Sequence, residues 1–187
     1  MQKNLQDALG LLRLFGSSDL FITFTANPNW HEVWEALLPG QQPFDRPDII
    51  ARVFHLKFNS LLKDIMQNQF FGKALGYVYT VGYQKRGLPH THSIIFLDRC
   101  AHLATPEAVN ALLSTEFPHK IHNRRLYDLV IQHMTHGPCG GTFKCPCMNA
   151  DGLCTKGFPK SFQEETVFTG DSYVKTQRRQ TGIQHSV

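Results

Sequence analysis

The stretch ALGYVYTVGYQKRGLPHTHSIIFLD, residues 74–98, decides the fold that we expect. Its first ten residues are rich in aromatic and β-branched side chains, which favour an extended strand. A basic turn follows, and Pro89 fits only at the start of the next strand. The apolar run that begins at His90 then leads the chain back. The stretch therefore predicts an antiparallel hairpin of two strands, 74–83 and 90–98.

Other segments of the chain have equally regular patterns. Residues 19–30 begin with alternating side chains, which predicts a further strand. From Asp48, apolar residues recur every three or four positions up to Ile65, which predicts an amphipathic helix capped by Asp48. Helical spacing returns at roughly 106–115 and 124–135. The order of these elements predicts an α/β (α+β) fold, a mainly antiparallel sheet with helices on one face.

The composition is that of a soluble globular protein. The chain has 187 residues, of which 42% are hydrophobic and 18% are charged. The net charge of +4 permits contact with phosphate without requiring it. The sequence has no secretory leader, and no apolar run reaches the length of a membrane span. We therefore expect an intracellular, soluble protein with no membrane partner.

His90 and His92 are the first candidates for chemistry. Side chains two residues apart on a strand point to the same face, so these imidazoles should project together. Such a pair can bind a divalent metal ion alongside oxygen ligands. The nearest third donor is Gln84, whose amide oxygen is a weak, neutral ligand. The spacing also allows a simpler interpretation, in which both histidines end a strand and bind water or backbone.

The cysteines form a second candidate site. Four of the five lie within residues 139–154, and in a reducing compartment such crowding favours metal binding over disulfides. A closed tetrahedral Zn²⁺ site is one interpretation, with ligands His136, Cys139, Cys147 and Cys154 and with Cys145 and His133 as spares. The alternative is a set of reduced cysteines in a tight loop that is rich in glycine and proline.

Four stretches, taken in order, resemble the Helitron helicase-like N-terminal domain, the replication-initiator endonuclease region of Helitron rolling-circle transposases. YQKRGLPHTHSIIFL (83–97) resembles the HUH motif of that family, and DLFITFTANPNWHEV (19–33) resembles its first motif. DRPDIIARVFHLKFNSLLKDI (45–65) is similar to the helix segment that follows the first motif. HMTHGPCG, CPCM and LCTKGFPKSF, within 133–162, resemble the cysteine-rich segment.

The resemblance implies an HUH/RRM-like sheet and a specific site. The Helitron-like domain would span 1–162, including the cysteine-rich loop segment 133–162, and the polar segment 163–187 would begin a truncated remainder. In HUH nucleases a tyrosine attacks a phosphodiester of single-stranded DNA, here a transposon end. The resemblance makes His90 and His92 ligands of Mg²⁺ or Mn²⁺ at that phosphate.

Three further residues of the hairpin follow from the resemblance. Many relatives have Glu at the position of Gly82, so Gln84 remains the candidate third ligand. Lys85 and Arg86 lie in the turn beside the HUH strand, where a phosphate would approach, and are expected to contact DNA.

The catalytic tyrosine that the resemblance implies is not recognisable in the sequence. The catalytic tyrosines of the family lie downstream of a stretch that SYVKTQRRQ (172–180) resembles, so we expect the chain to end before them and Tyr173 to be structural or a DNA contact. Tyr77, Tyr79 and Tyr83 share one strand face and are expected to be core or stacking residues.

Whether the chain is an enzyme therefore stays open at this point. One interpretation is an HUH-type single-stranded DNA endonuclease or strand-transferase domain, truncated before its tyrosine. The alternative is a non-catalytic DNA-binding or interaction module left from a decayed Helitron protein. A third interpretation is a hydrolytic metalloenzyme that uses the histidine pair, and it is disfavoured because the sequence offers no obvious carboxylate base near the pair. The sequence contains no G-x4-G-K-[ST] phosphate loop, so helicase activity would belong to the separate helicase domain of full-length relatives, and a nuclear location is expected.

Overall fold

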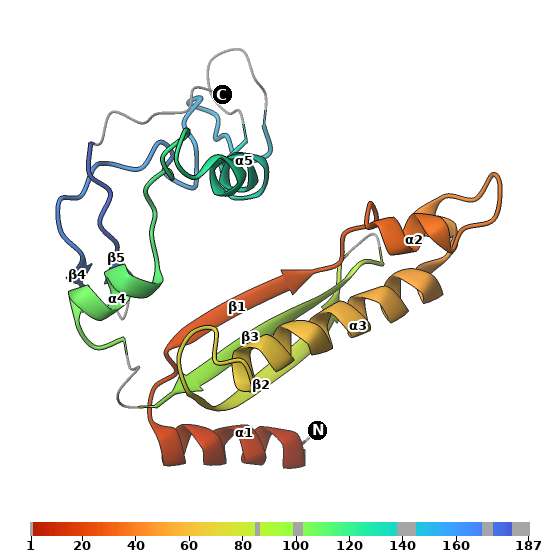
Figure 1. Cartoon of the computed structure of the whole chain (residues 1–187), viewed down its shortest axis with the longest axis horizontal. Coiled ribbons are helices and arrows are strands. Elements are labelled where there is room, and N and C mark those ends of the chain that lie inside the picture. Colours follow the sequence, from red (N-terminus) through yellow and green to blue (C-terminus); the bar gives the residue numbers. More distant parts are fainter. Residues whose placement is uncertain (1, 85–86, 99–102, 138–144, 170–173, 181–187) are drawn as a thin grey trace. The chain divides into compact units, whose positions relative to one another are not determined.

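The computed structural model describes residues 2–84, 87–98, 103–137, 145–169 and 174–180 (Figure 1). The chain forms two compact units, Met1–Leu103 and Ala104–Val187, and each is described by itself. The first unit contains α1 (Gln2–Phe15), β1 (Leu20–Thr25), α2 (His31–Glu35), a short 3-10 helix η1 (Pro43–Asp45), α3 (Pro47–Met66), β2 (Ala74–Tyr83) and β3 (Pro89–Leu97). The second contains α4 (Pro106–Leu112), α5 (Arg124–His133), β4 (Val167–Phe168) and β5 (Val174–Lys175).

The first unit is built on an antiparallel three-stranded sheet with the order β1-β3-β2. The predicted hairpin is confirmed, since β2 and β3 are its two strands. The register places Thr25 of β1 and Gly82 of β2 on either side of His90. Strand β3, which carries both histidines, is therefore the central strand, and the expected mixed fold with an antiparallel sheet is confirmed.

Helix α3 covers one face of this sheet (Figure 1). Phe58 of α3 contacts Phe24 of β1 and Tyr79 of β2, with ring centroids 6.0 and 4.9 Å apart. The buried side chains of α3 recur at helical spacing and are Ile49, Ile50, Phe54, Phe58, Leu62 and Ile65. The predicted amphipathic helix is confirmed, and its apolar stripe forms much of the core of this unit.

The start of α3 differs from the expected cap. The helix begins at Pro47, so Asp48 lies in the first turn and does not occupy the capping position. Arg46 donates two hydrogen bonds to the Asp48 carboxylate, at 2.9 and 2.8 Å. These bonds lower the pKa of Asp48 to about 2. Proline is favoured at the first helical position because its missing N–H would have no partner there in any case, which explains the shift.

Helix α1 packs against the opposite face of the sheet, so the expectation that the helices lie on one face is wrong. The rings of Phe15 and Phe96 lie 5.7 Å apart, and a Cβ on Gly76 would lie 3.3 Å from the Phe15 ring. Phe21, Thr23 and Thr25 of β1 lie on the same face and are exposed. The face that carries His90 and His92 is therefore accessible where the histidines lie. None of the helices in the described ranges is long and apolar enough to cross a membrane.

In the second unit, residues from 163–169 and 174–180 contact α4 and the residues that follow it. The Thr166 hydroxyl donates to the side chain of Asn110, and the Gln177 N–H donates to Thr166 at 2.9 Å. Arg179 donates to both carboxylate oxygens of Glu116, at 2.9 and 3.0 Å. These bonds connect the described part of the polar C-terminal segment to the rest of the unit. The predicted domain boundary at residue 162 stays a prediction.

Candidate functional site

His90 and His92 lie side by side on the central strand, on the same face of the sheet. Their ring centroids are 4.9 Å apart and the rings meet edge to face, at 74°. The expectation that the two imidazoles project together is therefore confirmed. His92 is exposed and His90 is half-buried.

Two residues of β1 hold the His92 ring. The hydroxyl of Thr23 lies 3.0 Å from His92 Nδ1, and the Phe21 ring stacks on His92 with centroids 5.6 Å apart at 15°. Histidine ligands commonly use one ring nitrogen for the metal and the other for a hydrogen bond that fixes the ring. Because Thr23 engages Nδ1, Nε2 of His92 is the nitrogen left for a ligand. The surroundings of His92 therefore fit a metal-binding role.

One ring nitrogen of His90, Nδ1, is buried. It has no hydrogen-bond partner among the described residues. An unpaired buried polar atom destabilises a fold by about 1–3 kcal/mol, so such atoms usually have a ligand or water in the functional state. The other ring nitrogen, Nε2, would lie 3.0 Å from a Cβ on Gly82, so the ring lies over that glycine. An unpaired imidazole nitrogen next to a second imidazole fits a cation site.

The structure describes the expected third ligand, Gln84, but not the two basic residues of the predicted turn. Gln84 is exposed, and only its backbone groups form hydrogen bonds within the described residues, with Leu88 and Gly87 at 2.9 and 2.8 Å. No third histidine, cysteine or carboxylate in the described ranges joins His90 and His92 as a metal-binding group. Lys85 and Arg86 lie outside the described residues.

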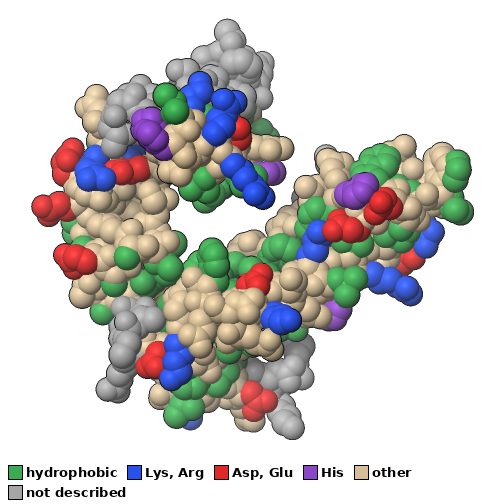
Figure 2. Space-filling model, in the orientation of Figure 1, with side chains coloured by type: hydrophobic (Ala, Val, Ile, Leu, Met, Phe, Trp, Pro, Cys, Tyr) green, Lys and Arg blue, Asp and Glu red, His purple; other side chains and the backbone are tan. Residues whose placement is uncertain are grey.

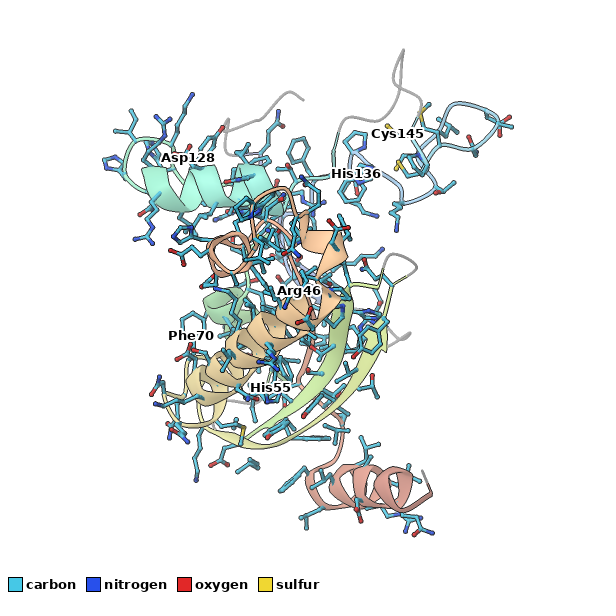
Figure 3. All side chains as sticks on the ribbon, turned by 90° about the vertical axis from the view of Figure 1, so that its right-hand side faces the viewer. Arg46, His55, Phe70, Asp128, His136 and Cys145 are labelled. Carbon is cyan, nitrogen blue, oxygen red and sulfur yellow. The ribbon has the colours of Figure 1, made fainter. Side chains whose placement is uncertain are left out.

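The cysteine-rich segment brings together three of the four predicted zinc ligands (Figure 3). His136 Nε2 lies 3.4 Å from Cys147 Sγ and 3.4 Å from Cys154 Sγ, and all three ligand atoms lie within 4.8 Å of one another. In a tetrahedral zinc site with ordinary bond lengths, neighbouring N and S ligand atoms are about 3.6 Å apart. The two N–S distances are therefore close to those of such a site.

A short hairpin places the two cysteines. The backbone N–H of Thr155 donates to Cys147 O at 2.7 Å, and Met148 and Cys154 form an antiparallel bridge. Asn149 closes the loop, because its Oδ1 accepts from Leu153 N at 2.8 Å and its own N–H donates to Leu153 O at 2.9 Å. The loop brings residues seven apart in sequence to one place.

The other contacts of His136 and the other predicted ligands complete the description of this segment. The ring of His136 stacks on Phe158, with centroids 4.3 Å apart, which fixes its orientation from the other side. Cys145 is half-buried in the same segment, and Cys139 lies outside the described residues. His133 is the last residue of α5. Zinc itself stays a prediction.

The comparison with known families shows to which family the chain belongs. The model of the Helitron helicase-like domain at N-terminus matches residues 1–95. The chain belongs to this family. The match includes the first motif, the helix segment and both histidines, and it ends within β3. Among curated proteins, none matches the chain. The chain is thus a Helitron-associated protein, and the resemblance seen in its motifs is confirmed.

The described tyrosines of this Helitron-like domain are badly placed for attack at the histidine pair. Tyr77 and Tyr79 stack on each other at 6.1 Å, and Tyr79 contacts Phe58 of α3, so they lie on the α3 face of the sheet. Tyr83 shares this face by strand alternation. Their single face is as predicted, and it is the one opposite His90 and His92. Tyr127 is buried against Phe117, and Tyr173 lies outside the described residues.

Basic side chains of this Helitron-like chain are dispersed. On the face shown in Figure 2, Lys and Arg side chains lie among acidic and uncharged ones and do not form one continuous field. Several are engaged in ion pairs, such as Lys57 with Glu32 at 2.6 Å and Arg124 with Asp128 at 2.8 Å. From the sequence, Phe21 could stack on a base but was expected to pack in the core, and its exposure shows that core packing is wrong. The contacts of Phe21 and Thr23 with His92 could not be predicted, because they depend on strand register.

Proposed function

We propose that this Helitron-like chain is the metal- and DNA-binding part of an HUH-type single-stranded DNA endonuclease. The observation that carries the proposal is the contact between His90 and His92 on an accessible sheet face, with Thr23 on Nδ1 of His92. Two adjacent imidazoles, one of them oriented by a hydrogen bond, can supply two ligands to a divalent cation. The match of residues 1–95 to the Helitron family supports the choice of DNA as the partner.

The proposed chemistry replaces a phosphodiester bond of the DNA backbone with a bond between the same phosphate and a tyrosine. A tyrosine hydroxyl attacks phosphorus and forms a 5′-phosphotyrosine bond, while the bond to the 3′ oxygen breaks and that oxygen leaves as a hydroxyl after taking up a proton. A phenol with a pKa of about 10 is a poor nucleophile at neutral pH, so the phosphate must be polarised. Mg²⁺ or Mn²⁺, when bound, supplies that polarisation and neutralises developing charge.

The residues of this chain have distinct roles in the proposal. His90 and His92 hold the cation, and Thr23 fixes the ring of His92. Lys85 and Arg86, in the turn that precedes β3, would attract the phosphate. The attacking tyrosine comes from outside the tyrosines that the structure describes, because those lie on the opposite face or are buried.

We also propose that the cysteine-rich segment binds Zn²⁺ as a structural ion. Three candidate ligand atoms within 4.8 Å of one another support it, and either Cys139 or Cys145 would complete the site. A closed site of this type stabilises the fold and has no open position for chemistry. A helicase domain as partner and a nuclear location remain predictions.

A second candidate function is a non-catalytic DNA-binding or interaction module. Position 82 favours it, because Gly82 offers no third ligand and the described residues supply none elsewhere. In this alternative the histidine face binds DNA without supporting strand cleavage.

One set of proteins tests the proposal. Binding and nicking of a single-stranded oligonucleotide are measured with Mn²⁺ for three proteins: the chain, its His90→Ala/His92→Ala variant, and a version extended downstream. His31→Ala/His55→Ala is the matched control, since both of these histidines are exposed in the same unit. The proposal expects Mn²⁺-dependent binding by the chain and by the control. It also expects the extended protein to cleave the oligonucleotide, and to lose that activity when His90→Ala/His92→Ala is introduced into it. Equal binding by all variants would contradict it, and binding without cleavage by the extended protein would favour the second candidate.

A further inference from the structure

Phe21 is a large apolar side chain in an unusual place. It is 68% exposed, although it is part of a paired strand as the second residue of β1. One face of its ring stacks on His92, at 15° and a centroid distance of 5.6 Å. Its position on the strand explains the exposure, because alternation directs Leu20 and Phe24 toward α3 and Phe21 toward the opposite face.

The neighbours of Phe21 make this face suited to a polar, planar ligand. Thr23 and Thr25 follow on the same side of β1 and are exposed. Helix α1 contacts the sheet through Phe15 at Phe96 and Gly76, away from the histidines. The accessible surface therefore contains one aromatic ring, hydroxyl groups and two imidazoles. That combination matches the chemistry of a nucleotide, which has a planar base with a π-face next to an anionic phosphate.

We propose that Phe21 is a base-stacking site for single-stranded DNA. The nucleobase adjacent to the phosphate at His90 and His92 stacks on the Phe21 ring and extends the existing stack with His92. Aromatic stacking tolerates any base, because every base has a π-face. This inference rests on the proposed function and adds to it a residue that touches the substrate and a reason for the exposure of the ring.

The inference differs from a simple packing role in what it expects of the side chain. If Phe21 only shields the His92 ring, any apolar side chain of similar size serves. If it stacks a base, an aromatic ring is required. Phe21→Leu and Phe21→Trp separate the two cases, because leucine keeps apolar volume and tryptophan keeps the aromatic face.

The test measures affinity for a fluorescent single-stranded oligonucleotide by anisotropy, with the whole chain and Mn²⁺. Phe21→Leu and Phe21→Ala are expected to weaken binding roughly tenfold, and Phe21→Trp to keep it. Tyr83→Leu is the matched control and should change nothing, since Tyr83 is also 68% exposed but lies on the α3 face of the same sheet. Equal binding by the Leu and Trp variants of Phe21 would overturn the inference.

An abasic scan of the oligonucleotide adds an independent readout. A missing base at one position should weaken binding to the native chain and have no further effect on Phe21→Ala, because both changes remove the same stack. Mn²⁺ binding without DNA, followed by electron paramagnetic resonance, should fall by less in Phe21→Leu than binding of the oligonucleotide does, because Thr23 still fixes the His92 ring. A parallel loss of Mn²⁺ binding would show that Phe21 acts only through His92 and would contradict the stacking role.

The outcomes separate this inference from the proposed function. If the native chain does not bind single-stranded DNA, both are wrong. If it binds with Mn²⁺ dependence and His90→Ala/His92→Ala abolishes that dependence while every Phe21 variant binds normally, the proposed function stands and only the stacking role is overturned.

Discussion

Gly82 lies directly opposite His90 in the sheet, and the ring of His90 occupies the space that a side chain at position 82 would need. A Cβ there would lie 2.9 Å from His90 Cε1 and 3.0 Å from Nε2. In this chain the glycine allows a close approach of the His90 ring to the backbone of β2, so the orientation of one proposed ligand depends on the absence of a side chain.

The first prediction concerns Gly82. Gly82→Ala should displace the His90 ring, because atoms at about 3 Å from a new Cβ must move. We expect Mn²⁺ affinity to fall on the order of tenfold, as for residues that support a ligand without contacting the metal. Titration of Mn²⁺ by electron paramagnetic resonance measures the affinity, and the imidazole signals of His90 in NMR spectra report the displacement. An unchanged affinity together with displaced His90 signals would argue against His90 as a ligand.

The second prediction concerns Thr23. Thr23→Val removes the hydroxyl that lies 3.0 Å from His92 Nδ1, so the ring loses the bond that fixes it. Mn²⁺ affinity should fall about 10- to 100-fold, while the free energy of unfolding changes by about 0.5 kcal/mol or less because Thr23 is exposed.

Two control variants make the Thr23 result specific. Thr23→Ser keeps the hydroxyl and should keep most of the affinity. Thr80→Val changes an exposed threonine on the other side of His92 and should have no effect. If Thr80→Val weakens Mn²⁺ binding as much as Thr23→Val does, the hydrogen bond is not the cause.

The third prediction concerns zinc. Elemental analysis of the purified chain should find one zinc per molecule, and Cys147→Ala/Cys154→Ala should abolish it. Cys100→Ala, outside the predicted ligand set, is the control and should keep the zinc. Removal of the metal by a chelator should destabilise the second unit, since ligand binding stabilises the folded state. A chain that contains no zinc and loses no stability with the chelator would contradict the site.

The fourth prediction concerns pH and the C-terminal segment. Arg179 donates to the Glu116 carboxylate and lowers its pKa below the ordinary value of 4.5. A lowered folded pKa means that this interaction stabilises the fold above the unfolded pKa and is lost as pH falls through the folded pKa. Glu116→Gln should therefore reduce the free energy of unfolding by about 1 kcal/mol at neutral pH and by almost nothing in strong acid.

Unfolding curves of Glu116→Gln and the native chain at a series of pH values measure that difference. Glu165→Gln, at an exposed position in the same segment, is the control and should behave like the native chain. A destabilisation by Glu116→Gln that is equally large in acid would mean that the charge of the carboxylate is not responsible.

The sequence predicts the hairpin and α3 well, because both depend on local periodicity. Alternation along 74–98 and helical spacing after Pro47 are each a property of one continuous segment. The common face of His90 and His92 follows in the same way from their spacing. Helix α1 was not predicted, and the structure shows that it packs on the sheet mainly through Phe15.

The supporting residues of the site could not be predicted, because they depend on register between distant segments. Thr23 and His92 are 69 positions apart and meet only because β1 pairs with β3 in one particular alignment. A shift of one residue would place Thr23 on the other face. The contact between His90 and Gly82 depends likewise on the pairing of β2 with β3. For the cysteine-rich segment, composition predicts the ligand types, and their spacing follows from the hairpin that Asn149 closes.

The central claim is that His90 and His92 hold a divalent cation against a phosphate of single-stranded DNA. Mn²⁺ binding to the whole chain, measured by electron paramagnetic resonance with and without a single-stranded oligonucleotide, tests it most directly. The account predicts one Mn²⁺ site in the native chain that the oligonucleotide tightens, and loss of that site in His90→Ala/His92→Ala but not in His31→Ala/His55→Ala. Equal Mn²⁺ binding by the native chain and the His90→Ala/His92→Ala variant, with no effect of the oligonucleotide, would contradict it.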